Sequence, residues 1–380
     1  FTKYLSKFQN YTSEQTAMMG SKDWNIADVT DSVLVTLTDK LTEGWHFDNF
    51  SEENLVAKDS GGFELLMNPT LAKDFDVNGL IQRHKEVGFG PNDTIISADF
   101  PIPRQDGLTN EETLRRQITS KEWFDYMKSE ISVTVPVVHG RTPDDVARHI
   151  DMYELDENQE VCFGSNLAQA KGRVYDSLKK GGQKPKQRGI RPSTTALWFD
   201  AIDMMSEVRN NERPVFLLGA GGMNAAPIAA LLGAKSVDAT SWRLNAMMKK
   251  IFCTDHGRFI NVGRDRVNYD QPWATEFLKE RLQDDKYPFA GMTFEELIQA
   301  FKLPGAASTE VCKLHNIYEL DRDAERLSDF SGDPTGLAKM LHKRFSSTWV
   351  DRNNLKVLDR AYSSVGGDAS VQDGTSNYKR

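Results

Sequence analysis

The chain has little cysteine, no long hydrophobic run and no excess of basic residues, and each absence excludes a class of protein. Three cysteines in 380 residues are too few for a disulfide framework and indicate a reducing compartment. No apolar run approaches the roughly 20 residues that span a bilayer, so we expect no membrane partner. The net charge of −8 excludes a bulk polycation, and any contact with nucleic acid must come from a local patch. We therefore expect a cytoplasmic protein.

The chain does have a large apolar fraction and a regular alternation of segment types. Hydrophobic residues make up 39% of the sequence, which is ample for a large core. Short apolar segments of strand character alternate with segments of helical spacing, and about eight strands are expected. This pattern predicts an α/β protein, and within that class a (β/α)8 TIM barrel with its active site at the carboxyl ends of the strands.

Composition suggests how the chain is divided. Residues 1–262 are expected to form the main part of the barrel, with a basic insertion at 171–191. Residues 263–350 are mostly of helical pattern and are expected to form a helical, zinc-binding-like subdomain and to complete the barrel. The segment 363–380 is rich in Gly, Ser and Asp, which predicts a disordered tail.

Acidic and polar residues follow several of the predicted strands. The sequence Lys-Asp-Ser-Gly-Gly-Phe-Glu at 58–64 follows an apolar run, and its glycines allow the backbone to approach a flat ligand closely. The local pattern also fits a simple Ser-Gly-Gly turn between two strands. However, the same position at other strand ends is taken by further candidates: Asp99, His139, Gly164, Gly219 and Asp238. Residues scattered over a surface would not coincide with strand ends in this way.

A glycine loop at 219–222 supports a rival interpretation. It follows a predicted strand, precedes a helix, and is followed about 20 residues later by Asp238, as in a dinucleotide-binding βαβ unit. The match is loose because Asn224 or Ala225 stands where the third glycine belongs. An oxidoreductase of this kind would also leave Asp59 and Asp99 without a role.

The segment 171–191 has eight basic residues and one acid, and glycine and proline interrupt it. Its alternatives are a solvated flexible loop and a phosphate-binding segment. For the second, the expected nucleic-acid contacts are Lys179, Lys180, Lys184, Lys186, Arg188 and Arg191, together with Arg243 further along the chain.

Six motifs, taken in order, resemble the tRNA-guanine transglycosylases. The segment 59–64 looks like that family's Asp-Ser-Gly-Gly-Phe-Gln, and 97–103 is similar to its strand that ends in a base-reading aspartate. The others are 137–140 (Val-Gln-Gly in the family), 163–165 (Gly-Gly-Leu), 216–221 (Tyr-Leu-Met-Gly-Val-Gly) and 238–243 (Asp-x-x-x-Pro-x-Arg, here one residue shorter and without the proline). Motif spacing agrees from about Asn54 to Phe259.

The departures from this family are also informative. His139 replaces a glutamine, the zinc motif is not intact, and the basic insertion separates two motifs that are usually close. These features resemble the DpdA branch, whose phage and bacterial members exchange guanine in DNA for a 7-deazaguanine of the preQ0 type. The resemblance therefore implies a DNA-guanine transglycosylase, in the host cytoplasm if a phage encodes it. A tRNA-guanine transglycosylase and a non-catalytic barrel that binds nucleic acid are the alternatives.

The resemblance also implies roles for individual residues. Asp238 would attack the sugar anomeric carbon and form a covalent glycosyl-enzyme, with Asp59 as general acid and base near the purine. Asp99 would accept hydrogen bonds from the guanine amidine edge. The remaining base contacts would come from Phe63 and Leu218 as a ring sandwich, from the backbone of Gly164 and Ser165, from Gly219, and from His139 as a donor to the base oxygen. Some of these residues have a structural alternative: Asp238 as a helix cap or a partner of Arg243, Phe63 and Leu218 as core packing, and His139 as a structural histidine.

A structural zinc ion is the one cofactor predicted, and no organic cofactor is expected. Glu310, Cys312 and His315 keep the spacing of the family's Cys-x-Cys-x-x-Cys, and His342 stands near the position of its distant histidine. A second candidate set joins Cys253 and His256 to Cys312 and His315. The alternative is that all these side chains only pack. The predicted partners are DNA with a flipped guanine and the 7-deazaguanine base, and a homodimer is left open.

Overall fold

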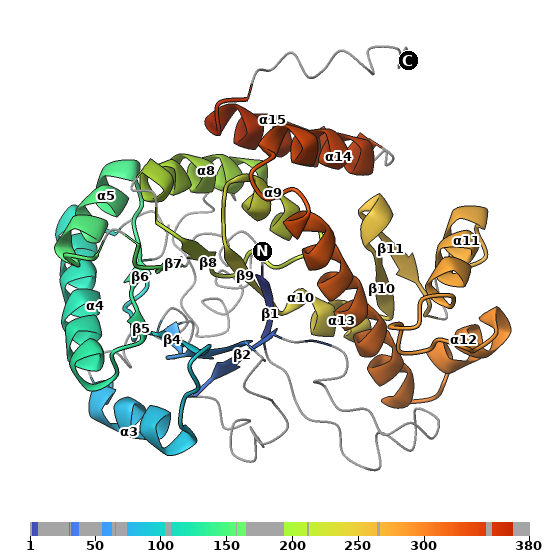
Figure 1. The fold of residues 1–380 in the computed structure, drawn as a ribbon, viewed down its shortest axis with the longest axis horizontal. Helices are drawn as coiled ribbons and strands as arrows, with labels where there is room; N and C mark the ends of the chain where they lie inside the picture. The colour runs from blue at the N-terminus through green and yellow to red at the C-terminus, as the bar shows by residue number, and fades with distance from the viewer. Residues whose placement is uncertain are drawn as a thin grey trace, which may run out of the picture.

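The computed structural model describes residues 2–6, 30, 32–37, 55–62, 65, 74–102, 108–156, 158–164, 194–210, 213–263, 267–346 and 352–367. It is a mixed α/β protein built on a parallel sheet, as the alternation predicted (Figure 1). No helix in these ranges is long and apolar enough to cross a membrane.

Nine strands form the main sheet, in the order β5-β4-β3-β2-β1-β9-β8-β7-β6. Every pairing between these described strands is parallel. The strands are β1 (Thr2–Ser6), β2 (Ser32–Thr36), β3 (Leu55–Asp59), β4 (Thr94–Ile96), β5 (Thr134–Val135), β6 (Val137–Val138), β7 (Val161–Phe163), β8 (Val215–Leu217) and β9 (Ser236–Ala239). Because the strands are parallel, their carboxyl ends share one edge of the sheet.

The two ends of this strand order, β5 and β6, are separated in the chain by Pro136 alone. Proline has no N–H to donate, which explains the break in an otherwise extended stretch. Its carbonyl still accepts from the Cys162 N–H of β7 at 2.8 Å, and the Val135 carbonyl accepts from Ser97 N–H at 2.9 Å. One continuous stretch of chain therefore bonds to β4 on one side and to β7 on the other.

Side chains alternate between the two faces of the sheet, as period-two strands require. One face packs a single cluster with a residue from each of six strands: Leu34, Ala57, Ile96, Val137, Cys162 and Phe216. The neighbouring residues of the same strands pack instead against helices. This six-residue cluster, called the inner cluster below, joins strands that lie far apart in the sheet order, such as β3, which carries Ala57, and β7, which carries Cys162.

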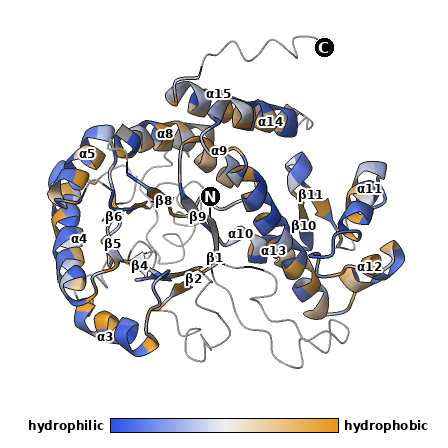
Figure 2. Ribbon diagram, viewed as in Figure 1, coloured by the Kyte–Doolittle hydropathy of each residue, from blue (hydrophilic) through white to orange (hydrophobic). Residues whose placement is uncertain are grey.

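Helices cover the other face of the sheet. Those between the strands are α3 (Val77–Val87), α4 (Asn110–Glu130), α5 (Pro143–Met152), α8 (Thr194–Asn210) and α9 (Ala225–Leu231), and α14 (Pro334–Ser346) and α15 (Arg352–Ser364) pack over α8 and α9. Thr142 caps α5, accepting from Asp145 N–H at 3.2 Å with Pro143 in the first turn. In Figure 2, helices such as α3 and α4 carry both hydrophobic and hydrophilic residues.

A second unit follows β9. Helix α10 (Ser241–Met247) leads to an antiparallel hairpin, β10 (Lys250–Cys253) and β11 (Arg258–Asn261), joined by the short η5 (Thr254–His256). This hairpin has its own core with α11 (Pro272–Arg281), α12 (Phe294–Phe301) and α13 (Ala307–Ser328). The end of the range 1–262, which was expected to belong to the barrel, therefore lies in this hairpin and not in the main sheet, and the second unit begins before residue 263.

Two other expectations change at the ends of the chain. Residues 2–6 form β1, the strand between β2 and β9, although the sequence pattern did not indicate a strand there. The tail predicted from 363 starts later, because α15 continues through Ser364 and the described chain through Gly367. The rest of that tail lies outside the described residues.

Candidate active site at the strand ends

Three aspartates lie at the carboxyl ends of strands in the main sheet. Asp59 ends β3, Asp99 follows β4 by three residues, and Asp238 is the third residue of β9. All three lie near the buried thiol of Cys162. Burial raises the pKa of this thiol well above its usual range, and the charges of Glu160 and of the three aspartates raise it further. The sheet thus gathers the three acids around one interior position, as the strand-end argument predicted.

Asp238 is held by the glycine loop that follows β8. The Gly219 N–H donates to its carboxylate Oδ1, and the Gly221 N–H donates to its main-chain carbonyl at 2.7 Å. Gly219 has a φ of +78°, and a Cβ on Gly221 would lie 2.2 Å from the Asp238 carbonyl oxygen. The loop therefore requires glycine at both positions. An amide that donates to a carboxylate favours its ionised form and fixes its direction.

Asp99 and His139 form a buried pair at neighbouring strand ends. The ring Nε2 of His139 lies 2.6 Å from Asp99 Oδ2, and the exposed fractions of the two side chains are 1% and 6%. An ionised carboxylate only accepts, so with Asp99 ionised Nε2 carries the proton. Both residues were predicted to contact a guanine base, and in the structure they contact each other directly.

Two glycines closely cover this pair. A Cβ on Gly62 would lie 2.1 Å from Asp99 Oδ1, and a Cβ on Gly164 would lie 2.9 Å from His139 Cε1. Neither position has room for a side chain, which explains the glycines of the 59–64 and 163–165 motifs in steric terms. The pair is therefore lined by main chain rather than by bulky side chains.

The main chain of His139 is fixed by two residues to which the sequence analysis gave no role. His149 Nδ1 accepts from the His139 N–H at 2.9 Å, and the Gln117 amide donates to the His139 carbonyl at 2.9 Å. Burial, and then the proximity of His139, lower the pKa of His149 to about 3, so its ring stays neutral and can accept. Both are helical positions whose polar type is unusual on a fully buried face, and this is the signal that could have identified them.

Asp59 ends β3, directly before the Ser-Gly-Gly turn at residues 60–62. Its Oδ2 accepts from the Thr36 hydroxyl of β2 at 3.3 Å. Lys58 points elsewhere, to the Gly88 carbonyl at 2.6 Å and to Asp93. Gly61 follows with a φ of +84°, so the Ser-Gly-Gly turn and the strand-end acid are both present.

Other predicted site residues divide into two groups. Leu218 packs partly buried against the inner cluster, Gly219 contacts Asp238, and Arg243 lies half-buried on α10. The remaining predictions fall outside the described residues: Phe63, Ser165, Lys179, Lys180, Lys184, Lys186, Arg188 and Arg191.

The residues predicted to bind zinc have other partners in the structure. Both ring nitrogens of His315 are engaged, Nδ1 with the Tyr287 hydroxyl at 2.7 Å and Nε2 with the Phe252 carbonyl at 2.8 Å. Cys312 packs in the core of the hairpin unit, whereas His342 pairs with Asp359 at 3.1 Å on α14, which packs on the main sheet's helices.

The other members of the two zinc sets have contacts of their own. Glu310 pairs with Lys313 at 2.6 Å, His256 lies against the Trp273 ring, and Cys253 is buried. Within the described ranges no group of three or more His, Cys, Asp or Glu side chains is arranged to hold a metal. Zinc binding therefore stays a prediction, and no step below depends on it.

Comparison of the chain with models of known protein families gives no match, and comparison with curated proteins gives none.

Proposed function

We propose that the main sheet closes into a (β/α)8 barrel. The support is the stretch 134–138, which bonds to β4 on one side and β7 on the other, and the inner cluster drawn from six strands. A single-layer cluster joining Ala57 to Cys162 requires a sheet that curls strongly. In such a barrel the strand ends carrying the three aspartates form one mouth.

We propose further that this mouth exchanges guanine in DNA for a 7-deazaguanine base. The observation that carries the proposal is Asp238, an acid at a strand end whose carboxylate receives a main-chain amide, on the same edge as the Asp99–His139 pair. A base exchange needs an ionised nucleophile at the sugar and a polar group that reads the purine, and these two features supply them.

The reaction would proceed in two displacements. An Asp238 oxygen forms a bond to the anomeric carbon as the bond from that carbon to the guanine nitrogen breaks, and Asp59 gives a proton to the departing base. The incoming 7-deazaguanine then returns a proton to Asp59 as its nitrogen attacks the same carbon and breaks the ester to Asp238. Two inversions preserve the β configuration, and Asp59 ends in its starting state.

Base recognition falls to Asp99 and His139. A carboxylate accepts from two neighbouring N–H groups of the guanine amidine edge, and adenine lacks that arrangement. In the structure Asp99 Oδ2 lies 2.6 Å from His139 Nε2. When guanine binds, it would take over this acceptor, and the His139 donor would turn to the base oxygen.

DNA is favoured over tRNA by the residues at which the chain departs from the tRNA enzymes, His139 and the basic insertion at 171–191. The flipped nucleotide has to leave its stack to enter the mouth, which requires a grip on the backbone. The basic insertion and Arg243 are the proposed phosphate contacts.

The test is incorporation of labelled guanine by the purified protein, with duplex DNA and bulk tRNA offered in parallel, and a repeat with 7-cyano-7-deazaguanine as the incoming base. Label in DNA alone supports the proposal. Label in tRNA alone keeps the chemistry and replaces the substrate. Label in neither, with either base, rejects base exchange and leaves a nucleic-acid-binding protein, which a salt titration of DNA binding then tests.

The dinucleotide alternative finds less support. Within the described sheet, strands consecutive in the chain are paired except for β5 and β6 at its two ends, and the order lacks the reversal at which dinucleotides bind. The Gly219 N–H, which would face a pyrophosphate, donates to Asp238. Titration with NAD should show no saturable binding, and submillimolar binding would restore that alternative.

A further inference from the structure

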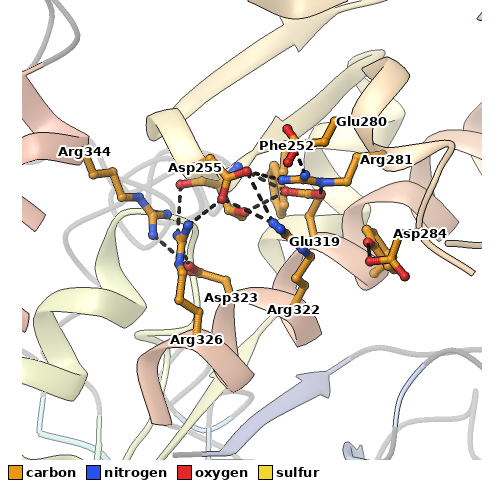
Figure 3. A network of polar contacts seen from close by, with 12 residues as sticks. Phe252, Asp255, Glu280, Arg281, Asp284, Glu319, Arg322, Asp323, Arg326 and Arg344 are labelled. Carbon is orange, nitrogen blue, oxygen red and sulfur yellow. Dashed lines mark hydrogen bonds and ion pairs between the residues drawn. The ribbon is translucent and has the colours of Figure 1, made fainter. Parts of the chain in front are cut away.

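A network of buried and partly buried charges runs from η5 and α11 of the hairpin unit, along α13, to helix α14 (Figure 3). Its centre is Asp255 on η5, which pairs with three arginines: Arg281, Arg322 and Arg326. Four members lie on α13 at helical spacing and therefore on one face: Glu319, Arg322, Asp323 and Arg326. The network is thus a rigid connection between two units of the protein.

One end of this network reaches the loop after β8. Arg326 pairs with Asp323 at 2.8 Å, and Asp323 pairs in turn with Arg344 of α14 at 2.8 Å. The second amino group of Arg344 donates to the main-chain carbonyl of Met223 at 2.6 Å. Asp323 and Arg344 are 1% and 2% exposed, so water competes little for these bonds.

Met223 belongs to the same short loop that holds Asp238. Gly219 and Gly221, at the start of the loop, donate to the carboxylate and the carbonyl of Asp238. Arg344 binds the other half of the loop, four residues after Gly219. The loop is therefore fastened on one side to the candidate nucleophile and on the other to a buried arginine.

We propose that Arg344 is a positioning residue for Asp238, because its bond to the Met223 carbonyl holds the glycine loop closed against the Asp238 carboxylate. The inference rests on the proposed function, in which Asp238 is the nucleophile. Arg344 does not touch the reacting atoms in this scheme. It acts through the direction and number of amide groups that face the carboxylate.

The role predicts a specific signature in the pH profile. An amide that donates to a carboxylate stabilises the ionised form, and the nucleophile must be ionised to attack. If the loop loosens, the carboxylate binds its proton at higher pH. The acid side of the pH–rate profile should then move to higher pH, which loss of overall stability alone would not produce.

The variant to test is Arg344→Lys. It keeps a positive charge beside the buried Asp323, so the fold is preserved, but an ammonium group cannot bridge Asp323 and the Met223 carbonyl as a planar guanidinium does. The matched control is Arg360→Lys on α15, whose exposed pair with Asp203 at 2.7 Å is remote from the loop. Thermal unfolding of both variants should show that each is folded at the assay temperature.

The first measurement is hydrogen–deuterium exchange of the peptide that spans residues 217–224, by mass spectrometry. Arg344→Lys should speed exchange of its slow amides on the order of tenfold, since a charge-assisted hydrogen bond is lost, and Arg360→Lys should not. This measurement needs no substrate. It therefore decides whether Arg344 holds the loop even if the protein exchanges no base.

The second measurement is base exchange. Arg344→Lys should lower kcat on the order of tenfold to a hundredfold, leave KM for the base within about twofold, and move the acid limb upward. Unchanged deuterium exchange, or faster exchange with an unaltered pH profile and kcat, overturns the proposal. If Arg344→Lys shows faster deuterium exchange but the wild-type protein has no base-exchange activity, the loop coupling is supported and the proposed function is rejected instead.

Discussion

Two groups of buried or partly buried charges in this protein differ in the kind of partner that each acid has. Asp255 receives three arginines, whereas Asp99 pairs with one histidine. Burial would raise the pKa of Asp255, but Arg281, Arg326 and Arg322 lower it below its usual range. Arginine does not lose its charge, while histidine can change protonation and hydrogen-bond role. The first group is suited to hold two units together, and the second to exchange partners with a ligand.

The largest effect should come from the nucleophile. Asp238→Asn keeps an acceptor for the Gly219 N–H but removes the negative charge, so base exchange should fall by about 10⁴-fold while thermal unfolding stays near wild type. The control is Asp203→Asn, a half-exposed acid remote from the strand ends. Loss of folding in Asp238→Asn would instead assign the residue a structural role.

The arginine network should dominate stability and not chemistry. Arg281→Met leaves the fully buried Glu319 without its arginine and removes one of the three arginines that pair with Asp255, so the free energy of unfolding should fall by about 3–5 kcal/mol. Urea unfolding measures it. Lys286→Met, which breaks the exposed pair with Glu325, should cost under about 1 kcal/mol. Equal costs for the two variants would contradict the distinction between the groups.

The histidine that supports the strand-end pair should make stability depend on pH. The pKa of His149 is about 3 in the folded protein against 6.5 for an ordinary histidine, so the unfolded chain binds its proton first as the pH falls. The contribution of His149 to the free energy of unfolding is therefore present above pH 6.5 and is lost as the pH falls from 6.5 toward 3. Between pH 7 and pH 5 this residue alone should cost about 2 kcal/mol.

His149→Gln isolates that contribution. A glutamine oxygen can still accept from the His139 N–H but does not titrate, so the decline between pH 7 and pH 5 should be shallower than in wild type. Urea unfolding at the two pH values gives the comparison. An identical decline in both proteins would show that other groups cause it.

The smallest effect should come from His139→Gln, which replaces the ring donor to Asp99 by an amide donor. Base exchange should fall by about tenfold or less, since the glutamine amide can still donate a hydrogen bond to Asp99. His139→Leu, which removes the donor and leaves Asp99 buried without it, should cost considerably more. Equal rates for the two variants would mean that the ring serves only packing.

Much of the fold could be predicted from the sequence because strands β2, β3, β4 and β7–β9 are apolar runs ended by glycine or an acid. The strand ends at Asp59, Asp99 and His139 followed from that pattern. β1 could not be predicted, because its residues, Thr-Lys-Tyr-Leu-Ser, lack such a run and gain strand structure only between β2 and β9. The segment of β11 was assigned to the main sheet because a strand pattern does not show which strand it pairs with.

The support of the site was the least predictable part. Glu319, Arg322, Asp323 and Arg326 have the spacing and composition of a solvated helix face, yet Glu319 and Asp323 are buried. Contacts with the neighbouring hairpin and with Arg344 of α14 turn that face inward. Similarly, Gln117 and His149 have no motif of their own, and their contacts with His139 arise from packing of α4 and α5 that no local pattern encodes.

Cys162 gives this arrangement a use in the laboratory. Its thiol is completely buried among the strands, and burial together with the nearby acids keeps it protonated. An alkylating reagent attacks the thiolate, so it should modify Cys162 only when the sheet opens. A base bound between the three aspartates would resist that opening. The rate at which this one cysteine is labelled would then report how fully the site is occupied, without any turnover.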